Sequence, residues 1–289
     1  MKKNKKTAIF MAILAAALYA LNSPVSKLLL TKVSSTILAG LLYLGAGIGM
    51  TAVRLIQKQM HVPYHEEKLT REDTPYTIGM VVLDIAAPIC LMIGLTMTTA
   101  ANASLLNNFE IVATSVIALF IFKEKISKRL WAAIVLVTLA SIILTVEDAS
   151  SFQFSFGSLF VLLACVCWGF ENNCTRTISN KDPLQIVVIK GFGSGLGSML
   201  IAFAIGERLP EVRYMFFAML LGFVAYGLSI FFYIYAQRTL GAAKTSAYYA
   251  VAPFIGVALS LIIFRELPTV SFLVALVIMG AGTYLASTD

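Results

Sequence analysis

The chain has 289 residues, of which 59% are hydrophobic and 13% are charged, and its formal net charge is +7. Soluble domains are about 45–50% apolar and about 25% charged, so this composition excludes a soluble enzyme or binding domain. It indicates an integral membrane protein.

Apolar runs of roughly 20 residues recur along the chain, and this is the length that a helix needs to cross a bilayer. The runs are continuous rather than alternating, so the strands of a membrane barrel do not fit. We expect an all-α integral membrane protein with ten transmembrane helices. The expected spans are 7–30, 34–56, 75–97, 100–122, 128–146, 155–178, 184–206, 212–237, 242–264 and 268–286.

The first span could be read as a cleaved signal peptide. Its apolar run continues through Lys27 without a clear small-residue cleavage site, so we expect a retained helix. With an even number of spans, both termini share one side, and most Lys and Arg residues in the loops fall on that side. This bias predicts a multi-pass protein of the cell (plasma) membrane with both termini cytoplasmic. It also accounts for the basic charge without nucleic-acid binding.

The longest hydrophilic stretch, 57–74, holds His61 and His65 four residues apart. Pro63 interrupts the helix that this spacing would need, so we expect no metal site there. The four cysteines lie inside predicted helices, and their spacing indicates neither a disulfide framework nor a zinc site. No cofactor is expected.

The chain repeats itself. Residues 100–127 match residues 242–269, and the acidic motifs FKEK and FREL stand at the matched ends. A second match aligns YALNSPVSK (19–27) with WGFENNCTR (168–176). We assign the repeats to 1–148 and 149–289. Five helices per repeat is an odd number, so the second copy should enter the membrane in the opposite orientation. Inverted repeats are typical of secondary transporters, which bind their substrate near the midplane between the halves.

These motifs resemble the EamA-type branch of the drug/metabolite transporter superfamily over nearly the whole chain. The similarity rests on YALN in the first span, CWGFENN in the sixth, and the acidic endings of the fourth and ninth. Two features depart from the family pattern: Ile111 stands where the ninth span has Pro253, and the closing glutamates lack a nearby glycine. The resemblance implies ten helices in two inverted five-helix repeats and ATP-independent transport of small metabolites, often amino acids.

Four ionisable residues fall well inside the predicted spans: Asp84, Glu110, Glu171 and Lys190. Each costs about 2.5–3.5 kcal/mol at a helix centre, so they should face one another or a watery cavity. A purely structural Lys190–Glu171 pair is one interpretation. With three acids and one base, at least one acid has no obvious internal partner. Such an acid could take up a proton or face a cationic group. Glu110 and Glu171 are the proton-coupling candidates, because a buried carboxyl group can titrate near neutral pH.

Prolines and aromatic residues mark further candidates. Pro24, Pro88 and Pro253 each deprive a carbonyl four residues earlier of its helical donor, which either kinks the helix or offers the carbonyl to a ligand. Tyr226 and Tyr233 lie on one face of the eighth span. Trp168 either lines the same cavity or belongs to an interfacial belt.

An aromatic cavity with carboxylates suits a zwitterion with an apolar side chain, and it equally suits an organic cation. The glycine runs 45–49 and 191–198 place small residues four apart, which indicates close helix packing rather than a nucleotide loop.

We therefore predict a secondary transporter that exports small polar or zwitterionic metabolites of amino-acid type by alternating access, with protons as the candidate coupling ion. The alternative is a carrier of organic cations such as quaternary amines or lipophilic drugs. No catalytic motif is present, so an enzyme is not expected. The expected partners are a small-molecule substrate and the lipid bilayer, in a monomer or a homodimer. The predicted substrate-binding residues are Asn22, Asp84, Asn107, Glu110, Trp168, Glu171, Asn172, Tyr226, Tyr233 and Tyr249.

Overall fold

The computed structural model describes residues 5–60, 66–123, 127–148, 153–240, 245 and 248–288, so His61 and His65 lie outside the described residues. The first half contains α1 (Lys5–Ala20), α2 (Asn22–Leu29), α3 (Ser35–Gln59), η1 (Arg71–Asp73), α4 (Thr74–Met97), α5 (Ala100–Leu106), α6 (Phe109–Phe122), α7 (Lys128–Thr145) and β1 (Val146–Asp148). The second half contains β2 (Gln153–Phe154), α8 (Phe156–Thr177), α9 (Pro183–Ala204), α10 (Val212–Gly222), η2 (Phe223–Leu228), α11 (Ser229–Leu240), α13 (Ala252–Phe264) and α14 (Val270–Ser287).

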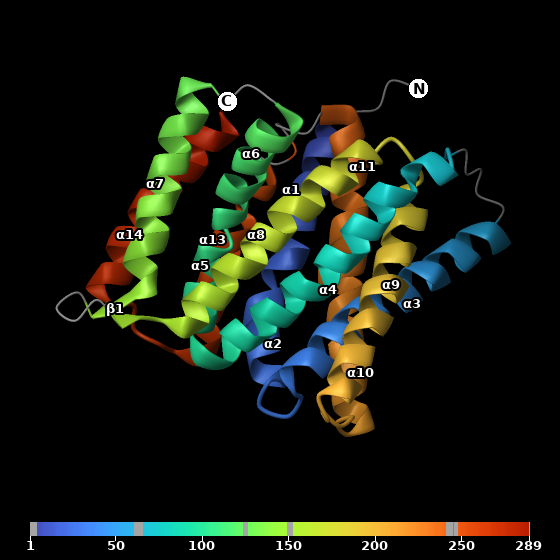
Figure 1. Cartoon of the computed structure of the whole chain (residues 1–289), viewed down its shortest axis with the longest axis horizontal. Helices are drawn as coiled ribbons and strands as arrows, with labels where there is room; N and C mark the ends of the chain where they lie inside the picture. Colours follow the sequence, from blue (N-terminus) through green and yellow to red (C-terminus); the bar gives the residue numbers. More distant parts are fainter. Residues whose placement is uncertain are drawn as a thin grey trace.

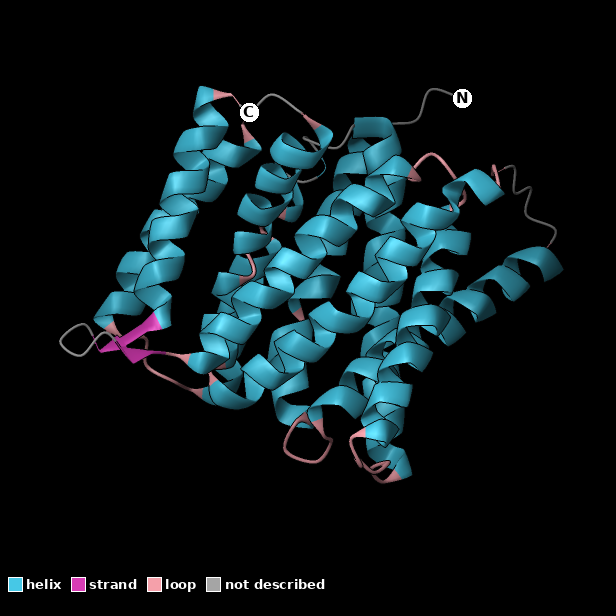
Figure 2. Ribbon diagram, viewed as in Figure 1, coloured by secondary structure: helices cyan, strands magenta, loops and turns pink. Residues whose placement is uncertain are grey.

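The helices lie side by side, and the two ends of the chain emerge at the same end of the bundle (Figure 1). Within the described ranges, eight helical stretches are long and apolar enough to cross a membrane, and α13 and α14 are apolar but shorter. The expected all-helical fold is therefore correct in its main feature, and the count of ten spanning helices stays a prediction. One addition is a short antiparallel hairpin, β1–β2, between α7 and α8 (Figure 2).

Glycines bring α3 and α9 into close contact, as the glycine runs predicted. A Cβ atom on Gly191 would lie 2.3 Å from the backbone of Gly47 in the facing helix. A Cβ atom on Gly45 would lie 2.0 Å from the carbonyl oxygen of Met219 in α10. No larger side chain fits at these positions without moving a backbone, so the three helices depend on glycine for their packing distance.

Several predicted spans are interrupted where the sequence holds polar or proline residues. The first span breaks at Leu21, between α1 and α2, one turn before Pro24. The fourth breaks at Asn107–Asn108, between α5 and α6. The eighth is not interrupted, but it widens into the π-helical turn η2. Breaks of this kind expose backbone groups inside a membrane protein and often line its binding site.

Pro253 occupies a position like that of Pro24, in the first turn of a helix, whereas Pro88 does not. Pro88 lies inside the continuous helix α4, where it leaves the helix unbroken. Pro253 occupies the first turn of α13, where a missing N–H is tolerated because that group has no helical partner. The expectation of a mid-helix kink at Pro253 is therefore wrong: this proline starts a helix.

The two repeat copies share a local backbone feature. α6 is followed by Lys123 and α13 by Arg265, and both residues adopt left-handed backbone conformations with φ of 54°. In both copies a hydroxyl then caps the next helix: Ser127 accepts from the N–H of Leu130, and Thr269 accepts from that of Phe272. Glu124, in the first closing motif, lies outside the described residues.

The end of the bundle away from the termini is tied by Glu207, which follows the turn after α9. Its carboxylate accepts hydrogen bonds from the Ser34 hydroxyl and the Ile37 N–H, both at 2.8 Å. An acidic group at a helix N-terminus satisfies orphan donors and complements the helix dipole. Glu207 therefore caps α3 from a different part of the chain.

We expect Glu207→Ala to destabilise the protein by about 1–2 kcal/mol, because α3 loses this cap. Thermal unfolding of the purified protein in detergent would measure the change. Glu211→Ala is the matched control, since Glu211 is exposed and pairs only with nearby Arg213 among the described residues. Equal unfolding midpoints for the two variants would contradict the capping role.

Candidate functional site

Three buried charges from three helices form one cluster. Lys190 of α9 places its Nζ 2.5 Å from Glu171 Oε1 in α8 and 3.2 Å from Asp84 Oδ2 in α4. All three residues are at most 3% exposed. Thr175 also donates to Glu171 Oε1, and the Tyr43 hydroxyl lies within reach of Asp84. The Lys190–Glu171 pair is thus confirmed, and Asp84 is its third member.

The geometry distinguishes the two contacts of Lys190. The contact to Glu171 is a charge-assisted hydrogen bond, whereas Asp84 Oδ2 is an ion-pair partner without hydrogen-bond alignment. Two carboxylates share one ammonium group, so the cluster keeps one formal negative charge when all three groups are ionised. A buried arrangement of this kind is sensitive to the loss of any member.

Glu110 has a different environment. It lies in the first turn of α6, directly after the break at Asn107–Asn108, where a helix N-terminus favours an acidic group. Its Oε1 accepts a hydrogen bond from Asn172 Nδ2 at 2.5 Å. Glu110 is only half-buried, and among the described residues no cation pairs with it within 4.0 Å. Of the three buried acids, Asp84, Glu110 and Glu171, only Glu110 keeps accessible surface and has no paired cation among the described residues.

Aromatic rings from both halves of the chain form a continuous cluster. The ring of Tyr19 lies 6.4 Å from that of Trp168 and 5.9 Å from those of Tyr226 and Tyr249, centroid to centroid. Two further rings join at 4.9 Å, Tyr43 against Tyr226 and Tyr233 against Tyr249. The aromatic cluster consists of Tyr19, Tyr43, Trp168, Tyr226, Tyr233 and Tyr249.

Trp168 is 6% exposed and packs against Tyr19 inside the bundle, so it does not belong to an interfacial belt. Glu110 lies near enough to Tyr19 and Tyr249 to interact with them electrostatically. The Asp84–Lys190 pair adjoins the cluster through Tyr43. The aromatic cluster therefore connects the unpaired acid to the paired charges.

Asn22 is held at the break between α1 and α2. Its Nδ2 donates to the Tyr226 hydroxyl at 2.9 Å, and its Oδ1 accepts from the Ser26 hydroxyl at 3.1 Å. The Ser229 hydroxyl donates to the Ala15 carbonyl and lies 3.5 Å from the Tyr249 hydroxyl. The Asn22 amide and the Ser229 hydroxyl therefore contact the hydroxyls of Tyr226 and Tyr249.

Nine of the ten predicted site residues fall in these connected groups. Asn107 joins them only through its backbone: it is 7% exposed, and its carbonyl oxygen accepts from the Glu110 N–H at 3.1 Å and lies 3.9 Å from the Cys165 thiol. Tyr19 and Tyr43 were missed by the prediction. Tyr19 had a usable signal, because the repeat match aligns it with Trp168, and the structure brings these two rings into contact.

The end of the bundle that carries the termini is also tied across the two halves. Asp182 caps α9 by accepting from the N–H of Leu184 at 2.9 Å and pairs with Arg54 of α3 at 3.4 Å. Nearby, Lys181 donates to Glu67 at 2.5 Å, and this hydrogen bond raises the pKa of Lys181. Together with Glu207 at the other end, these contacts hold α3 and α9 together on both sides of the buried cluster.

One family model matches both halves of the chain. The model of the EamA-like transporter family matches residues 6–146 and again 155–288. An uncharacterised transporter of Methanothermobacter thermautotrophicus is 23% identical over 290 residues, which cover 94% of this chain and 84% of that protein. A protein crystal structure matches 99% of this chain and 96% of its own with a TM-score of 0.67 and 15% identity, which shows a shared fold.

The double match of one family model agrees with a duplicated chain, and the apolar helices agree with a multi-pass membrane protein. The chain belongs to the EamA-like transporter family, and it is a membrane transporter.

Proposed function

We propose that this transporter exports small zwitterionic metabolites of amino-acid type, and that Glu110 receives either the ammonium group of the substrate or a proton. The observation that carries the proposal is the environment of Glu110: half-buried, without a paired cation among the described residues, and beside the aromatic cluster. A carboxylate next to aromatic faces attracts a cationic group by charge and by cation–π contact.

The same region supplies partners for the other end of a zwitterion. The Asn22 amide and the Tyr226 and Tyr249 hydroxyls lie in or against the aromatic cluster and contain hydrogen-bond donors. A substrate carboxylate can accept from such groups, while an apolar side chain packs on the rings. An amino-acid-type molecule matches this combination of one acid, several donors and aromatic walls.

The contacts favour Glu110 over Glu171 as the proton-coupling residue. Glu171 is neutralised by Lys190, whereas Glu110 has only a neutral amide partner among the described residues. Glu110 is half-buried and keeps accessible surface, so it can exchange a proton when the site opens.

We further infer that the site lies between two inverted repeats, 1–148 and 149–289, which rock about it in alternating access. The residues around it support this view, because α1, α4 and α6 come from the first half of the chain and α8, α9 and η2 from the second. Both termini would then face the cytoplasm and the Glu207 end would face outward across the plasma membrane, in a monomer or a homodimer.

Counterflow in proteoliposomes tests the proposed substrate class. Liposomes loaded with an unlabelled amino acid should accumulate the labelled form through the transporter. Tyr19→Ala should reduce this exchange at least about tenfold, because Tyr19 contacts three other rings of the cluster. Tyr284→Ala is the control, since Tyr284 is 64% exposed on α14. Loss of exchange in both variants, or exchange of no amino acid by the wild type, would overturn the proposal.

A carrier of organic cations is the second candidate. The buried site contains three carboxylates and one lysine, so it has an excess of acids that a permanent cation can balance. The same liposomes loaded with choline or tetraethylammonium separate the two functions. Exchange of quaternary amines without exchange of amino acids would establish the second candidate.

A further inference from the structure

One hydrogen bond connects Glu110 to the second half of the chain. Asn172 of α8 donates through Nδ2 to Glu110 Oε1 in α6 at 2.5 Å, and the same nitrogen lies 3.4 Å from the Thr114 hydroxyl oxygen. Glu110 and Thr114 are four residues apart, so they share one face of α6. Asn172 therefore reaches the face of α6 that carries the half-buried acid.

The partners of Asn172 follow from its place in the polar triplet Glu171–Asn172–Asn173 of α8. Successive residues of a helix point about 100° apart, so three consecutive polar side chains face different neighbours. Glu171 pairs with Lys190 of α9, whereas Asn172 and Asn173 both bind α6. Asn172 is the member of the triplet that contacts the acid without a paired cation.

Other contacts already hold α6 against α8. A Cβ atom on Gly169 would lie 2.7 Å from the Cβ of Ala113 and 2.9 Å from the backbone nitrogen of Thr114, so a larger side chain does not fit without a shift. Asn173 Nδ2 donates to the Thr114 carbonyl oxygen at 3.2 Å. Because neither contact involves Asn172, the Asn172 amide is not needed to bring the two helices together.

The carboxyl group of Glu110 is held at one oxygen. Oε1 accepts from Asn172, and Oε2 accepts no hydrogen bond from the described residues. An ionised carboxyl group has about four lone-pair sites, so a single donor leaves most of them open. The bond to Asn172 restricts rotation of the group and leaves Oε2 as the oxygen that can meet a ligand.

We propose that Asn172 is a positioning residue for Glu110, which holds one carboxyl oxygen so that the other meets the substrate or the proton. The proposal rests on the role of Glu110 in the proposed function. Asn172 acts through Glu110, so its loss weakens only the steps in which Glu110 takes part. A residue that merely supports the fold would weaken every step alike.

Two assays in proteoliposomes test the proposal: counterflow of a labelled amino acid below the wild-type KM, and flux driven by an imposed pH gradient. Glu110→Gln, measured in parallel, identifies which assay depends on Glu110. In that assay Asn172→Leu, which is of similar size and has no donor, should be about tenfold slower, because a charge-assisted hydrogen bond is lost. In an assay that Glu110→Gln leaves intact, Asn172→Leu should match the wild type.

The kinetic constants give a second readout. Where counterflow depends on Glu110, Asn172→Leu should raise KM about tenfold and leave the maximal rate within about twofold of the wild type. Asn172→Gln keeps the N–H donors on a longer side chain and should stay within about threefold of the wild type. An Asn172→Gln variant as impaired as Asn172→Leu would show that side-chain shape matters and not the donor, against the proposal.

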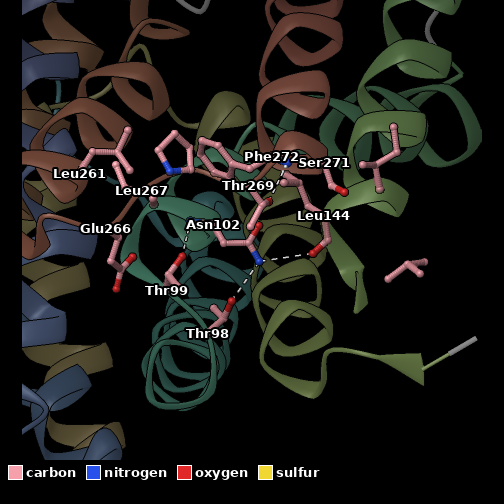
Figure 3. A pocket seen from close by; sticks show the side chains of 14 residues that line it. Thr98, Thr99, Asn102, Leu144, Leu261, Glu266, Leu267, Thr269, Ser271 and Phe272 are labelled. Atoms are coloured by element: carbon pink, nitrogen blue, oxygen red, sulfur yellow. Dashed lines mark hydrogen bonds between the residues drawn. The ribbon is translucent and has the colours of Figure 1, made fainter. Parts of the chain in front are cut away.

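Asn102→Leu is the matched control for loss of an asparagine amide. Asn102 lies in α5, in a separate pocket at the end of the bundle away from the termini (Figure 3). Its Nδ2 donates to the hydroxyls of Thr98 and Ser158, both at 2.9 Å, and to no acid among the described residues. At equal amounts of monodisperse protein, this variant should match the wild type in both assays.

The variants separate failure of the proposal from failure of the proposed function. Wild-type rates of Asn172→Leu in the assay that Glu110→Gln loses would overturn the positioning role and leave the role of Glu110 intact. Impairment of Asn172→Leu in an assay that Glu110→Gln passes would show that Asn172 acts independently of Glu110, which also overturns the proposal. If Glu110→Gln passes both assays, the role of Glu110 itself is refuted, and the positioning role is refuted with it.

Discussion

If Glu110 carries a proton, Glu110→Gln should abolish flux driven by an imposed pH gradient in proteoliposomes, to the level of empty liposomes, while amino-acid counterflow continues; if Glu110 binds the ammonium group of the substrate, counterflow should be lost as well. Glutamine keeps the carbonyl oxygen that accepts from Asn172 Nδ2, so the local structure is retained. It cannot take up or release a proton. Counterflow requires no net proton movement, so the comparison of the two assays on the same liposomes isolates the coupling step.

Glu211→Gln serves as the control for removal of a carboxylate, because Glu211 is exposed and lies far along the chain from the buried groups. Glu171→Gln tests the competing assignment. Since Glu171 is bonded to Lys190, its replacement should lower thermal stability and leave the gradient dependence intact. Gradient-driven flux that survives Glu110→Gln would refute the role of Glu110, and flux lost only in Glu171→Gln would transfer the role to Glu171.

Lys190→Met should destabilise the protein by about 3–5 kcal/mol, the largest effect expected of a single substitution here. The ammonium group contacts carboxylates on both α4 and α8, and its removal leaves two buried acids without a counter-charge. The expected result is a large fall in the unfolding midpoint and in the yield of monodisperse protein. Fluorescence-detected size-exclusion chromatography after heating would measure both.

A rescue experiment distinguishes charge from packing. Adding Asp84→Asn and Glu171→Gln to Lys190→Met removes every charge of the cluster and should recover most of the lost stability, since neutral groups are not penalised for burial as ions are. Arg213→Met is the surface control and should cost less than about 1 kcal/mol, because its partner Glu211 is 67% exposed. A triple variant as unstable as Lys190→Met would show that the lysine side chain acts through its packing.

The helical stretches were predictable because the bilayer sets a minimum apolar length, and the expected spans agree with the observed helices to within a few residues at most ends. The interruptions were less predictable. Pro24 and Pro253 each lie in the first turn of a helix that begins after a turn in an apolar run, whereas Pro88 lies inside the unbroken α4. A proline removes one donor in each case, and the neighbouring helices decide whether the helix continues or restarts.

The sequence by itself determined which residues had to find partners. Asp84, Glu110, Glu171 and Lys190 are expensive in lipid wherever they lie, so their inward placement follows from solvation alone. The alignment of Tyr19 with Trp168 likewise follows from the duplication. These inferences depend on composition, length and repetition, which can be read directly from the amino-acid sequence.

Only the tertiary structure decided the pairing. Lys190 could neutralise any of three acids, and it contacts Glu171 and Asp84 while Glu110 remains with an amide. Hydrophobic periodicity is nearly absent in helices that are apolar on every side, so the sequence does not specify how each helix is rotated about its axis. That rotation follows from the glycine contacts of α3 with α9 and α10 and from the packing of α4 on α8. It leaves Glu110 as the half-buried acid without a paired cation among the described residues.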